Sequence, residues 1–343
     1  MSAQTGTVVA IALLWAVSGG IHDAATLTAS GIASRALAPR RAIAIVGVFG
    51  FAGPLVAGTA VATTIASFVD LDGLAPPSAL GTVAAGLAAA IAWNVATWRL
   101  GIPASSTHGL VGGLVGATIV AAGPGDVNWG VAALADGKVE GVLKVVVALL
   151  ASPLIGLAVG ALVLRAGAWT LRSARAAWNR RLRRMQWPTV AALSFAHGAN
   201  EAQKSMGIIA LALLAGGSTD RLEVPTWAVL LSAATIPLGA IVGGWRIVRT
   251  LGFGIYRLRP LHAAGAQVAA AAVVGATSVW GGPVSTSQVT SSAIIGVGAA
   301  ERPRAVRWES GKAMLVAWLL TIPCTALFAA ALAGILRAAG AID

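Results

Sequence analysis

Two short polar motifs each occur twice in this chain, about half its length apart. The first pair is SGGIHDAAT at 18–26 and HGANEAQK at 197–204, and the second pair is PASSTH at 103–108 and PVSTSQ at 283–288. The interval from Asp23 to Glu201 is nearly equal to the interval from Pro103 to Pro283. Two different motifs that return at nearly the same spacing in one chain predict an internal duplication.

The composition predicts a protein that crosses a membrane many times. Hydrophobic residues make up 57% of the chain and charged residues 10%, with a mean hydropathy of +0.83. A soluble domain has roughly a quarter of its residues charged, so that class is excluded. Apolar runs of membrane-spanning length recur from end to end, which predicts an all-α polytopic membrane protein. The predicted segments are 7–34, 42–66, 79–99, 103–122, 141–165, 188–215, 226–245, 262–281, 284–300 and 311–336.

The positions of the charged residues orient the chain. The net charge is +12, and most of the arginines lie within 35–41, 165–184, 246–259 and 302–312. Acidic residues dominate the other connections, at 70–72, 126–140 and 220–223. This is the positive-inside pattern, so we expect the arginine clusters in the cytoplasm and both termini outside the cell membrane. Arginines in short loops indicate solvated loops or contacts with anionic lipids, and not a nucleic-acid-binding surface.

Each half of the chain contributes five segments, so the second half has to enter the membrane from the opposite face. The predicted architecture is two inverted repeats, 1–165 and 188–343, joined by a basic cytoplasmic linker at 166–187. The third and fourth segments of each half are joined by only a few residues. Each such pair is compatible with two full spans or with one re-entrant hairpin. In both cases the chain returns to the same side of the membrane, so the predicted topology does not distinguish them.

Each half also places one carboxylate inside an apolar segment. These residues are Asp23 and Glu201, and the histidines His22 and His197 precede them. A carboxylate is costly in the hydrocarbon zone, so it predicts a functional site. Because glycines stand beside both carboxylates, we expect the helix to break there and to free carbonyl groups that coordinate a small cation. The alternative to a functional site is that Asp23 and Glu201 belong to a structural polar pair between the two repeats.

The second motif places three hydroxyl groups directly after a proline in each half. Proline is favoured at helix N-termini, where unpaired backbone N–H groups and the positive end of the helix dipole attract anions. Two such helix starts, related by inversion, would meet at the middle of the membrane and bind a tetrahedral oxyanion. A simple helix cap is the alternative for one copy alone. The hydroxyl groups belong to Ser105, Ser106, Thr107, Ser285, Thr286 and Ser287.

Two further polar residues end these motifs. Lys204 is one turn beyond Glu201 and is expected to neutralise it, with attraction of the anion as the alternative. His108 is expected to be a hydrogen-bonded structural residue. The sequence has no nucleophile elbow, no P-loop and no metal-ligand spacing. We therefore predict no enzyme and no resident cofactor or metal.

These motifs resemble those of the Pit-type inorganic phosphate transporter family. HGANEAQKSMGIIA at 197–210 is similar to its second signature, and GIPASSTHG at 101–109 and PVST at 283–286 are similar to its serine-rich motifs. GGWRIVRTLG at 243–252 and AWLLTIP at 317–323 extend the likeness to the C-terminus. The resemblance implies symport of inorganic phosphate with Na⁺ or H⁺ by alternating access, in a homodimer.

The resemblance also implies roles for individual residues. Phosphate is expected to contact Asp23, Asn200 and the six hydroxyl groups at 105–107 and 285–287. The coupling cation is expected at Asp23, His22, His197, Asn200 and Glu201. Residues with a secondary role are Thr26, His108, Gln203, Lys204, Gln267 and Gln288.

Several positions depart from the family pattern. His22 and Thr26 stand where the first signature has asparagines, and Glu201 replaces an aspartate. Gln288 replaces a histidine, and Gln267 stands where many members have an intramembrane glutamate. The loss of amide ligands and of one carboxylate favours H⁺ coupling, with phosphate carried free or as a neutral metal–phosphate complex. Coupling to Na⁺ is the alternative.

Two rival functions follow from the same motifs. The first is symport of sulfate or another oxyanion on the same scaffold. Asp23 favours phosphate, because phosphate keeps a proton near neutral pH and can donate it to a carboxylate, whereas a bare carboxylate would repel sulfate. The second rival is a channel or a non-transporting sensor. Paired broken helices that close on one site favour a carrier over an open pore.

Overall fold

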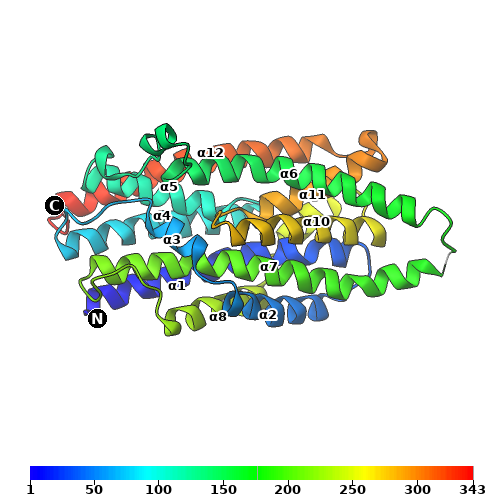
Figure 1. Ribbon diagram of the computed structural model, residues 1–343, viewed down its shortest axis with the longest axis horizontal. Coiled ribbons are helices and arrows are strands. Elements are labelled where there is room, and N and C mark those ends of the chain that lie inside the picture. Colours follow the sequence, from blue (N-terminus) through cyan, green and yellow to red (C-terminus); the bar gives the residue numbers. More distant parts are fainter. Residues whose placement is uncertain (176, 343) are drawn as a thin grey trace.

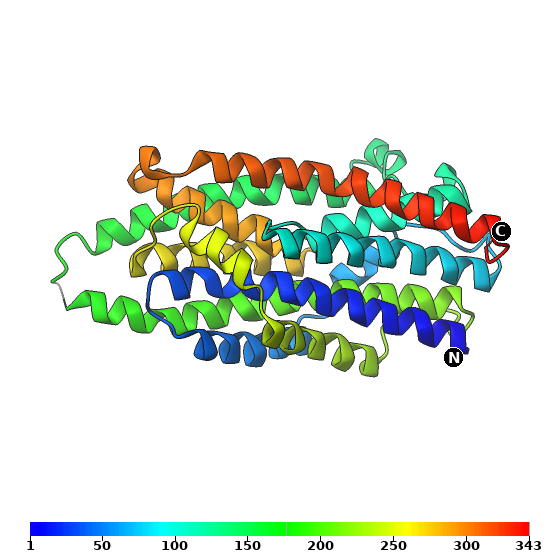
Figure 2. The same cartoon turned by 180° about the vertical axis from the view of Figure 1, so that it is seen from behind.

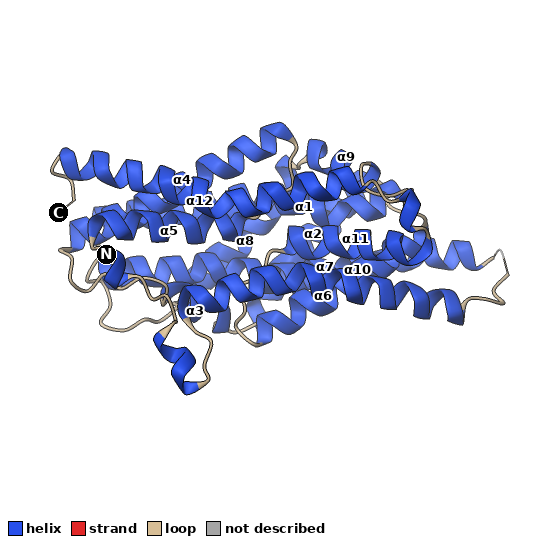
Figure 3. Cartoon of the chain, turned by 90° about the horizontal axis from the view of Figure 1, so that it is seen from above, coloured by secondary structure: helices blue, strands red, loops and turns tan. Residues whose placement is uncertain are grey.

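The computed structural model describes residues 1–175 and 177–342, and in this part of the chain every regular element is helical (Figure 3). The α-helices are α1 (Ala3–Ala33), α2 (Pro39–Val56), α3 (Ala60–Ala66), α4 (Pro76–Leu100), α5 (Ser106–Ala121), α6 (Gly141–Thr170), α7 (Trp178–Ala215), α8 (Thr226–Val242), α9 (Trp245–Phe253), α10 (Pro260–Val279), α11 (Thr286–Glu301) and α12 (Trp308–Ala338). This confirms the predicted all-α class. The range 166–187, predicted as a linker, is mostly helical, because α6 continues to Thr170 and α7 begins at Trp178.

Membrane-spanning length and hydropathy are found in α1, α2, α4, α6, α10 and α12. The helices α8 and α9 together form a further candidate span that is bent by 79° at the glycine pair Gly243–Gly244. The start of α1 and the end of α12 lie at one end of the elongated bundle, and α6 ends and α7 begins at the opposite end (Figure 1). The multi-pass membrane character predicted from composition is therefore confirmed.

The third and fourth predicted segments of each half form helical hairpins, α4–α5 and α10–α11. Glycines with positive φ form the turns, at Gly101 (φ 70°) after α4 and at Gly281 (φ 67°) after α10. The helices α5 and α11 have 16 residues each, which corresponds to about 24 Å. This is shorter than the roughly 30 Å of a hydrocarbon core. The helices α5 and α11 are therefore too short to cross it as straight helices, whereas α4 and α10 are long enough. The tips of the two hairpins approach each other near the centre of the bundle (Figure 2).

Two other predicted segments are interrupted in the structure. The segment 42–66 is divided into α2 and α3 around Gly58, whose φ is +73°. The segment 226–245 corresponds to α8, and the chain then turns sharply into α9. Both interruptions fall at glycines that adopt a backbone conformation that other residues rarely adopt.

The two halves pack on each other in a reciprocal way. Hairpin helix α5 packs against α12 of the second half, and α11 packs against α6 of the first half. In the same manner α1 packs on α8, and α7 packs on α2. Glycines allow these close approaches: Gly20 meets Gly239 where α1 crosses α8, and Gly198 meets Gly50 where α7 crosses α2.

The prediction that the helices break at the two carboxylates is wrong. Both α1 and α7 continue through Asp23 and Glu201. The neighbouring glycines Gly20 and Gly198 serve the helix crossings instead, because an added Cβ at either position would meet the backbone of the partner helix. The non-helical backbone at the centre of the protein comes from the turns that precede α5 and α11.

Candidate functional site

The starts of α5 and α11 have the same construction. Ser105 Oγ accepts a hydrogen bond from the backbone N–H of His108 at 3.1 Å, and Ser285 Oγ accepts one from Gln288 at 3.4 Å. Each serine is therefore an N-cap that satisfies one of the free N–H groups of its helix. The residues of both starts are buried. The two predicted helix N-termini are confirmed, and they lie at the facing tips of the two hairpins (Figure 2).

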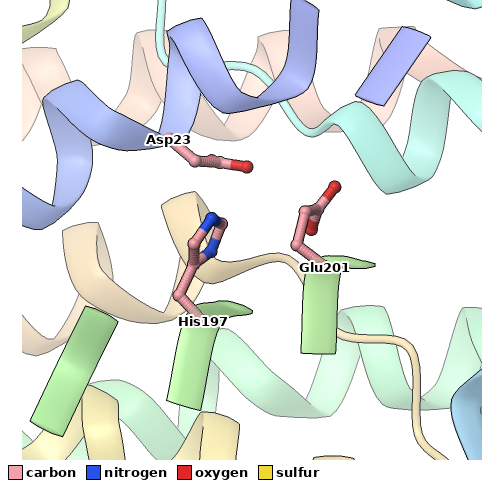
Figure 4. A group of neighbouring side chains, drawn as sticks. All are labelled: Asp23, His197 and Glu201. Carbon is pink, nitrogen blue, oxygen red and sulfur yellow. The ribbon is translucent and has the colours of Figure 1, made fainter. Parts of the chain in front are cut away.

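Asp23 of α1 and Glu201 of α7 point toward one another beside these helix starts (Figure 4). One oxygen from each carboxylate and one ring nitrogen of His197 lie within 4.8 Å of one another. All three side chains are buried, with exposed fractions of 3% or less. The structure thus brings together two carboxylates that the sequence places about half a chain length apart.

Lys204 is completely buried and joins three elements. Its ammonium group donates to Glu201 Oε2 at 2.5 Å, to Thr107 Oγ1 at 2.6 Å and to the carbonyl oxygen of Val284 at 2.9 Å. Neutralisation of Glu201 was the expected role, and the ion pair is present. An ammonium group has three N–H donors, and all three are used within the protein.

The other hydroxyl groups of the helix starts also contact the charged residues. Ser106 donates to Glu201 Oε1 at 3.0 Å, and Ser287 donates to Asp23 Oδ1 at the same distance. Thr286 Oγ1 lies 3.0 Å from His197 Nδ1. Both starts therefore reach across the interface between the halves: α5 binds Glu201 of the second half, and α11 binds Asp23 of the first. With both carboxylates ionised, the buried cluster has two negative charges and one positive charge.

His22 and Asn200 hold the hairpins from outside this cluster. His22 Nε2 lies 3.0 Å from the carbonyl oxygen of Asn94 in α4. Asn200 donates to Ser278 Oγ and to the carbonyl oxygen of Gly282, both at 3.1 Å. His22 is thus bonded to α4. Asn200 is bonded to the last turn of α10 and to the connection that follows it. Asn200 Oδ1 has no hydrogen bond with any residue that the structure describes, so it can still accept one.

The residues with an expected secondary role lie in different places. Gln288 Nε2 lies 3.3 Å from His108 Nδ1, next to the helix starts. Gln203 accepts a hydrogen bond from the backbone of Val61 and therefore supports the start of α3. Gln267 of α10 donates to Ser30, which lies about two turns beyond Asp23 in α1, and accepts from Thr189.

Thr26 is buried, and its hydroxyl has no hydrogen bond with any described residue. Two backbone groups were not expected at the site: the carbonyl oxygen of Val284, which binds Lys204, and that of Ala104, which accepts from Ser287 at 3.1 Å. A backbone carbonyl has no sequence signature of its own. Because each of these two residues directly follows the proline of its motif, the duplication is the signal that could have identified them as a pair.

A divalent metal fits this cluster poorly, although Asp23, His197 and Glu201 could supply three ligand atoms. Both oxygens of Glu201 already accept hydrogen bonds, one from Ser106 and one from Lys204. A divalent ion bound there would lie close to the ammonium group and be repelled by it. The donor set is therefore better suited to a single positive charge.

Comparisons with known proteins agree with this architecture. The sequence pattern of the phosphate transporter family matches residues 19–329. A probable low-affinity inorganic phosphate transporter of Bacillus subtilis is 36% identical over 94% of both chains, and one of Rhizobium meliloti is 37% identical over 94% of this chain and 93% of its own. A solved structure described as the sodium-dependent phosphate transporter has a TM-score of 0.82, at 23% identity, and covers 98% of this chain and 100% of its own. That likeness shows a shared fold.

Proposed function

Because the chain belongs to the phosphate transporter family, we propose that it is a secondary active transporter that carries inorganic phosphate together with protons by alternating access. The observation that carries this proposal is the meeting of two capped helix starts with two carboxylates in a buried centre. Helix N-termini attract oxyanions through free N–H groups and through the helix dipole. The hydroxyl groups of both starts are additional hydrogen-bond donors. They now donate to protein oxygens and could donate to phosphate oxygens instead.

The proposed phosphate ligands are Asp23, Asn200 and the hydroxyl groups at 105–107 and 285–287. A carboxylate beside an oxyanion site favours an anion that can donate a proton. Phosphate does this near neutral pH and sulfate does not, so Asp23 supports phosphate over sulfate. Asn200 is supported by its free Oδ1, which can accept a hydrogen bond from a protonated phosphate oxygen.

Proton coupling is supported by the different surroundings of the two carboxylates. Glu201 is paired with Lys204 at 2.5 Å. Asp23 accepts a hydrogen bond from the Ser287 hydroxyl. A buried carboxylate without its own ammonium partner suits a carried proton, and one ring nitrogen of His197 lies within 4.8 Å of it. His22 and Asn200 are the other proposed coupling residues. Metal–phosphate transport is the less favoured alternative, because Lys204 occupies one side of the group that could bind a metal.

The alternating-access part of the proposal rests on the two hairpins. The second helix of each hairpin is short. The tips of the two hairpins meet at the site, and each hairpin packs on a long helix of the other half. Two inverted repeats, 1–165 and 188–343, joined by a basic cytoplasmic linker at 166–187, would produce this reciprocal packing. We propose in addition that the protein is a homodimer of the cell membrane, with its arginine clusters in the cytoplasm near anionic lipids.

Phosphate uptake into proteoliposomes tests the proposal. Wild type is compared with Asp23→Asn and Glu201→Gln under separate proton and Na⁺ gradients, and with the matched surface variants Asp72→Asn and Glu309→Gln. We expect saturable uptake that a proton gradient drives without Na⁺, that sulfate and a metal chelator leave unchanged, and that only the two buried substitutions reduce. Strict dependence on Na⁺ at fixed pH would refute proton coupling, and an ionic conductance in place of saturable uptake would refute the carrier.

A further inference from the structure

The three oxygen atoms around the Lys204 ammonium group have counterparts in the other half of the chain. Glu201 corresponds to Asp23 in the first pair of motifs. Thr107 and Val284 correspond to Ser287 and Ala104 in the second pair, because each holds the same place after the proline of its motif. The first set consists of a carboxylate, a hydroxyl group and a backbone carbonyl. The second set consists of the same three groups.

The second set is also assembled in space. Ser287 Oγ donates to Asp23 Oδ1 at 3.0 Å and to the carbonyl oxygen of Ala104 at 3.1 Å. The corresponding bond in the first set runs from Thr107 Oγ1 to the carbonyl oxygen of Val284 at 3.5 Å. In both sets a hydroxyl group from one hairpin therefore meets a carbonyl group of the other hairpin, beside a carboxylate from α1 or α7.

The two sets differ in the residue that stands where Lys204 does. The equivalent position in α1 is Thr26, three residues after Asp23 as Lys204 is three residues after Glu201. This spacing places Thr26 on the same helix face as Asp23. Thr26 is 0% exposed, and its Oγ1 makes no hydrogen bond with any residue that the structure describes. Where the first set has a tethered ammonium group, the corresponding residue of the second set carries a hydroxyl oxygen.

We propose that these two sets are equivalent cation positions, and that Lys204 permanently fills one of them. The other position, formed by Asp23, Thr26, Ser287 and the Ala104 carbonyl, takes the single exchangeable monovalent cation that accompanies each phosphate. This inference rests on the proposed function and adds to it the number of coupling ions and the residue that fixes this number. A carrier with a threonine at both positions would need two exchangeable cations.

The charge balance of the cluster gives the physical reason. The Lys204 ammonium compensates Glu201 and cannot leave, so that half of the site is neutral at every stage of transport. The negative charge of Asp23 is compensated only by an ion that enters and leaves. Phosphate brings further negative charge to the same buried volume, where an uncompensated charge is costly. Phosphate and one cation at Asp23 should therefore bind together, and the release of either should weaken the binding of the other.

Phosphate binding to the purified full-length protein tests the ion number. Radiolabelled phosphate is titrated while one cation is varied at a time, with Na⁺ changed at fixed pH and with pH changed in the absence of Na⁺. For the cation that supports binding, wild type should show a Hill coefficient of about 1. Lys204→Thr, which makes the two sets alike, should raise the coefficient to about 2. Thr26→Lys, which tethers a cation in the second set, should bind phosphate without dependence on that cation.

A conservative pair of substitutions in one helix tests the second set without changing a charge. Thr26→Val removes the proposed fourth oxygen and should raise the cation concentration for half-maximal binding about tenfold or more. Thr28→Val is the control, because the Thr28 hydroxyl bonds to the carbonyl of Ala24 within its own helix. A wild-type Hill coefficient of about 2, or equal effects of the two valine substitutions, would overturn the inference. Absence of phosphate binding by wild type with every cation would instead refute the proposed function.

Discussion

The imidazole Nδ1 of His108 lies 3.3 Å from the amide Nε2 of Gln288. These two residues occupy the same place in the two serine-rich motifs, one in each half of the chain. A direct contact between equivalent positions requires the two copies to face one another at the centre of the protein. It supports a two-fold relation between the halves, with the axis close to this contact. The contact itself is asymmetric, because the amide donates and the imidazole nitrogen accepts.

The effect of a substitution at His108 should therefore depend on whether the new side chain can form this hydrogen bond, and not on whether it can transfer a proton. His108→Gln retains an acceptor for the Gln288 amide and should keep phosphate uptake within a fewfold of wild type. His108→Leu leaves that buried amide without a partner, which costs about 1–3 kcal/mol, and should lower the thermal unfolding temperature. Uptake and unfolding are measured on the same purified samples. A loss of uptake in His108→Gln as large as in His108→Leu would show that an imidazole is needed.

The glycine contacts between the halves should tolerate no side chain. In Gly198→Ala the new Cβ would meet the carbonyl oxygen of Gly50, so α7 and α2 would have to separate. Overpacking of this kind typically costs about 1–3 kcal/mol. The control is Gly73→Ala, because no atom lies within 4 Å of a Cβ added at Gly73. We expect a lower unfolding temperature in detergent for Gly198→Ala alone, and equal unfolding temperatures for the two variants would contradict the close crossing.

The orientation of the bundle can be measured with cysteines at its two ends. Cys324 is the only native cysteine, so Cys324→Ser gives a background without thiols. Ser2 precedes α1, and Ser173 lies in the connection between α6 and α7 at the opposite end. Both residues are exposed. In intact cells a membrane-impermeant maleimide should label Ser2→Cys, and it should label Ser173→Cys only after permeabilisation. The reverse pattern would invert the proposed topology.

A hydrogen bond at the C-terminal end of α11, away from the hairpin turn, should stabilise the second hairpin. The Tyr256 hydroxyl donates to Glu301 Oε2 at 2.5 Å and thereby ties the connection before α10 to the last residue of α11. Burial and this hydrogen bond raise the pKa of Tyr256 to about 12, so the hydroxyl remains a donor until the pH rises through that value. Tyr256→Phe should lower stability by about 1.5–3 kcal/mol, as for a bond to a charged group. When unfolding is measured at several pH values near neutrality, Tyr256→Phe should show the same loss of stability at each.

The sequence predicted the helical segments well where apolar runs end at proline or glycine. It missed the interruption between α2 and α3, because the hydropathy of 42–66 is continuous and only the positive φ of Gly58 divides it. It also placed helix breaks at Asp23 and Glu201, since a glycine that allows a close crossing looks the same in a sequence as one that ends a helix.

The members of the site were predicted more completely than their contacts. Polar residues inside apolar runs identified Asp23, Glu201 and both serine-rich motifs. Local spacing also predicted the partner of Lys204 within its own helix. Its other two partners, Thr107 and Val284, lie 97 and 80 residues away in the sequence. No local pattern encodes such contacts, because they depend on how the two hairpins pack.

The reciprocal packing of the hairpins has a consequence for the synthesis of the protein. The hairpin helix α5 is complete at Ala121, but its partner α12 begins at Trp308, near the end of the chain. During translation the polar tip of the first hairpin must therefore remain in the membrane without its final neighbour until the second half has been made as far as α12. A nascent chain in this condition exposes a polar, glycine-rich surface to lipid and to quality-control proteases. Truncations that remove only α12 should thus be degraded as a whole, and the first half made alone should not accumulate.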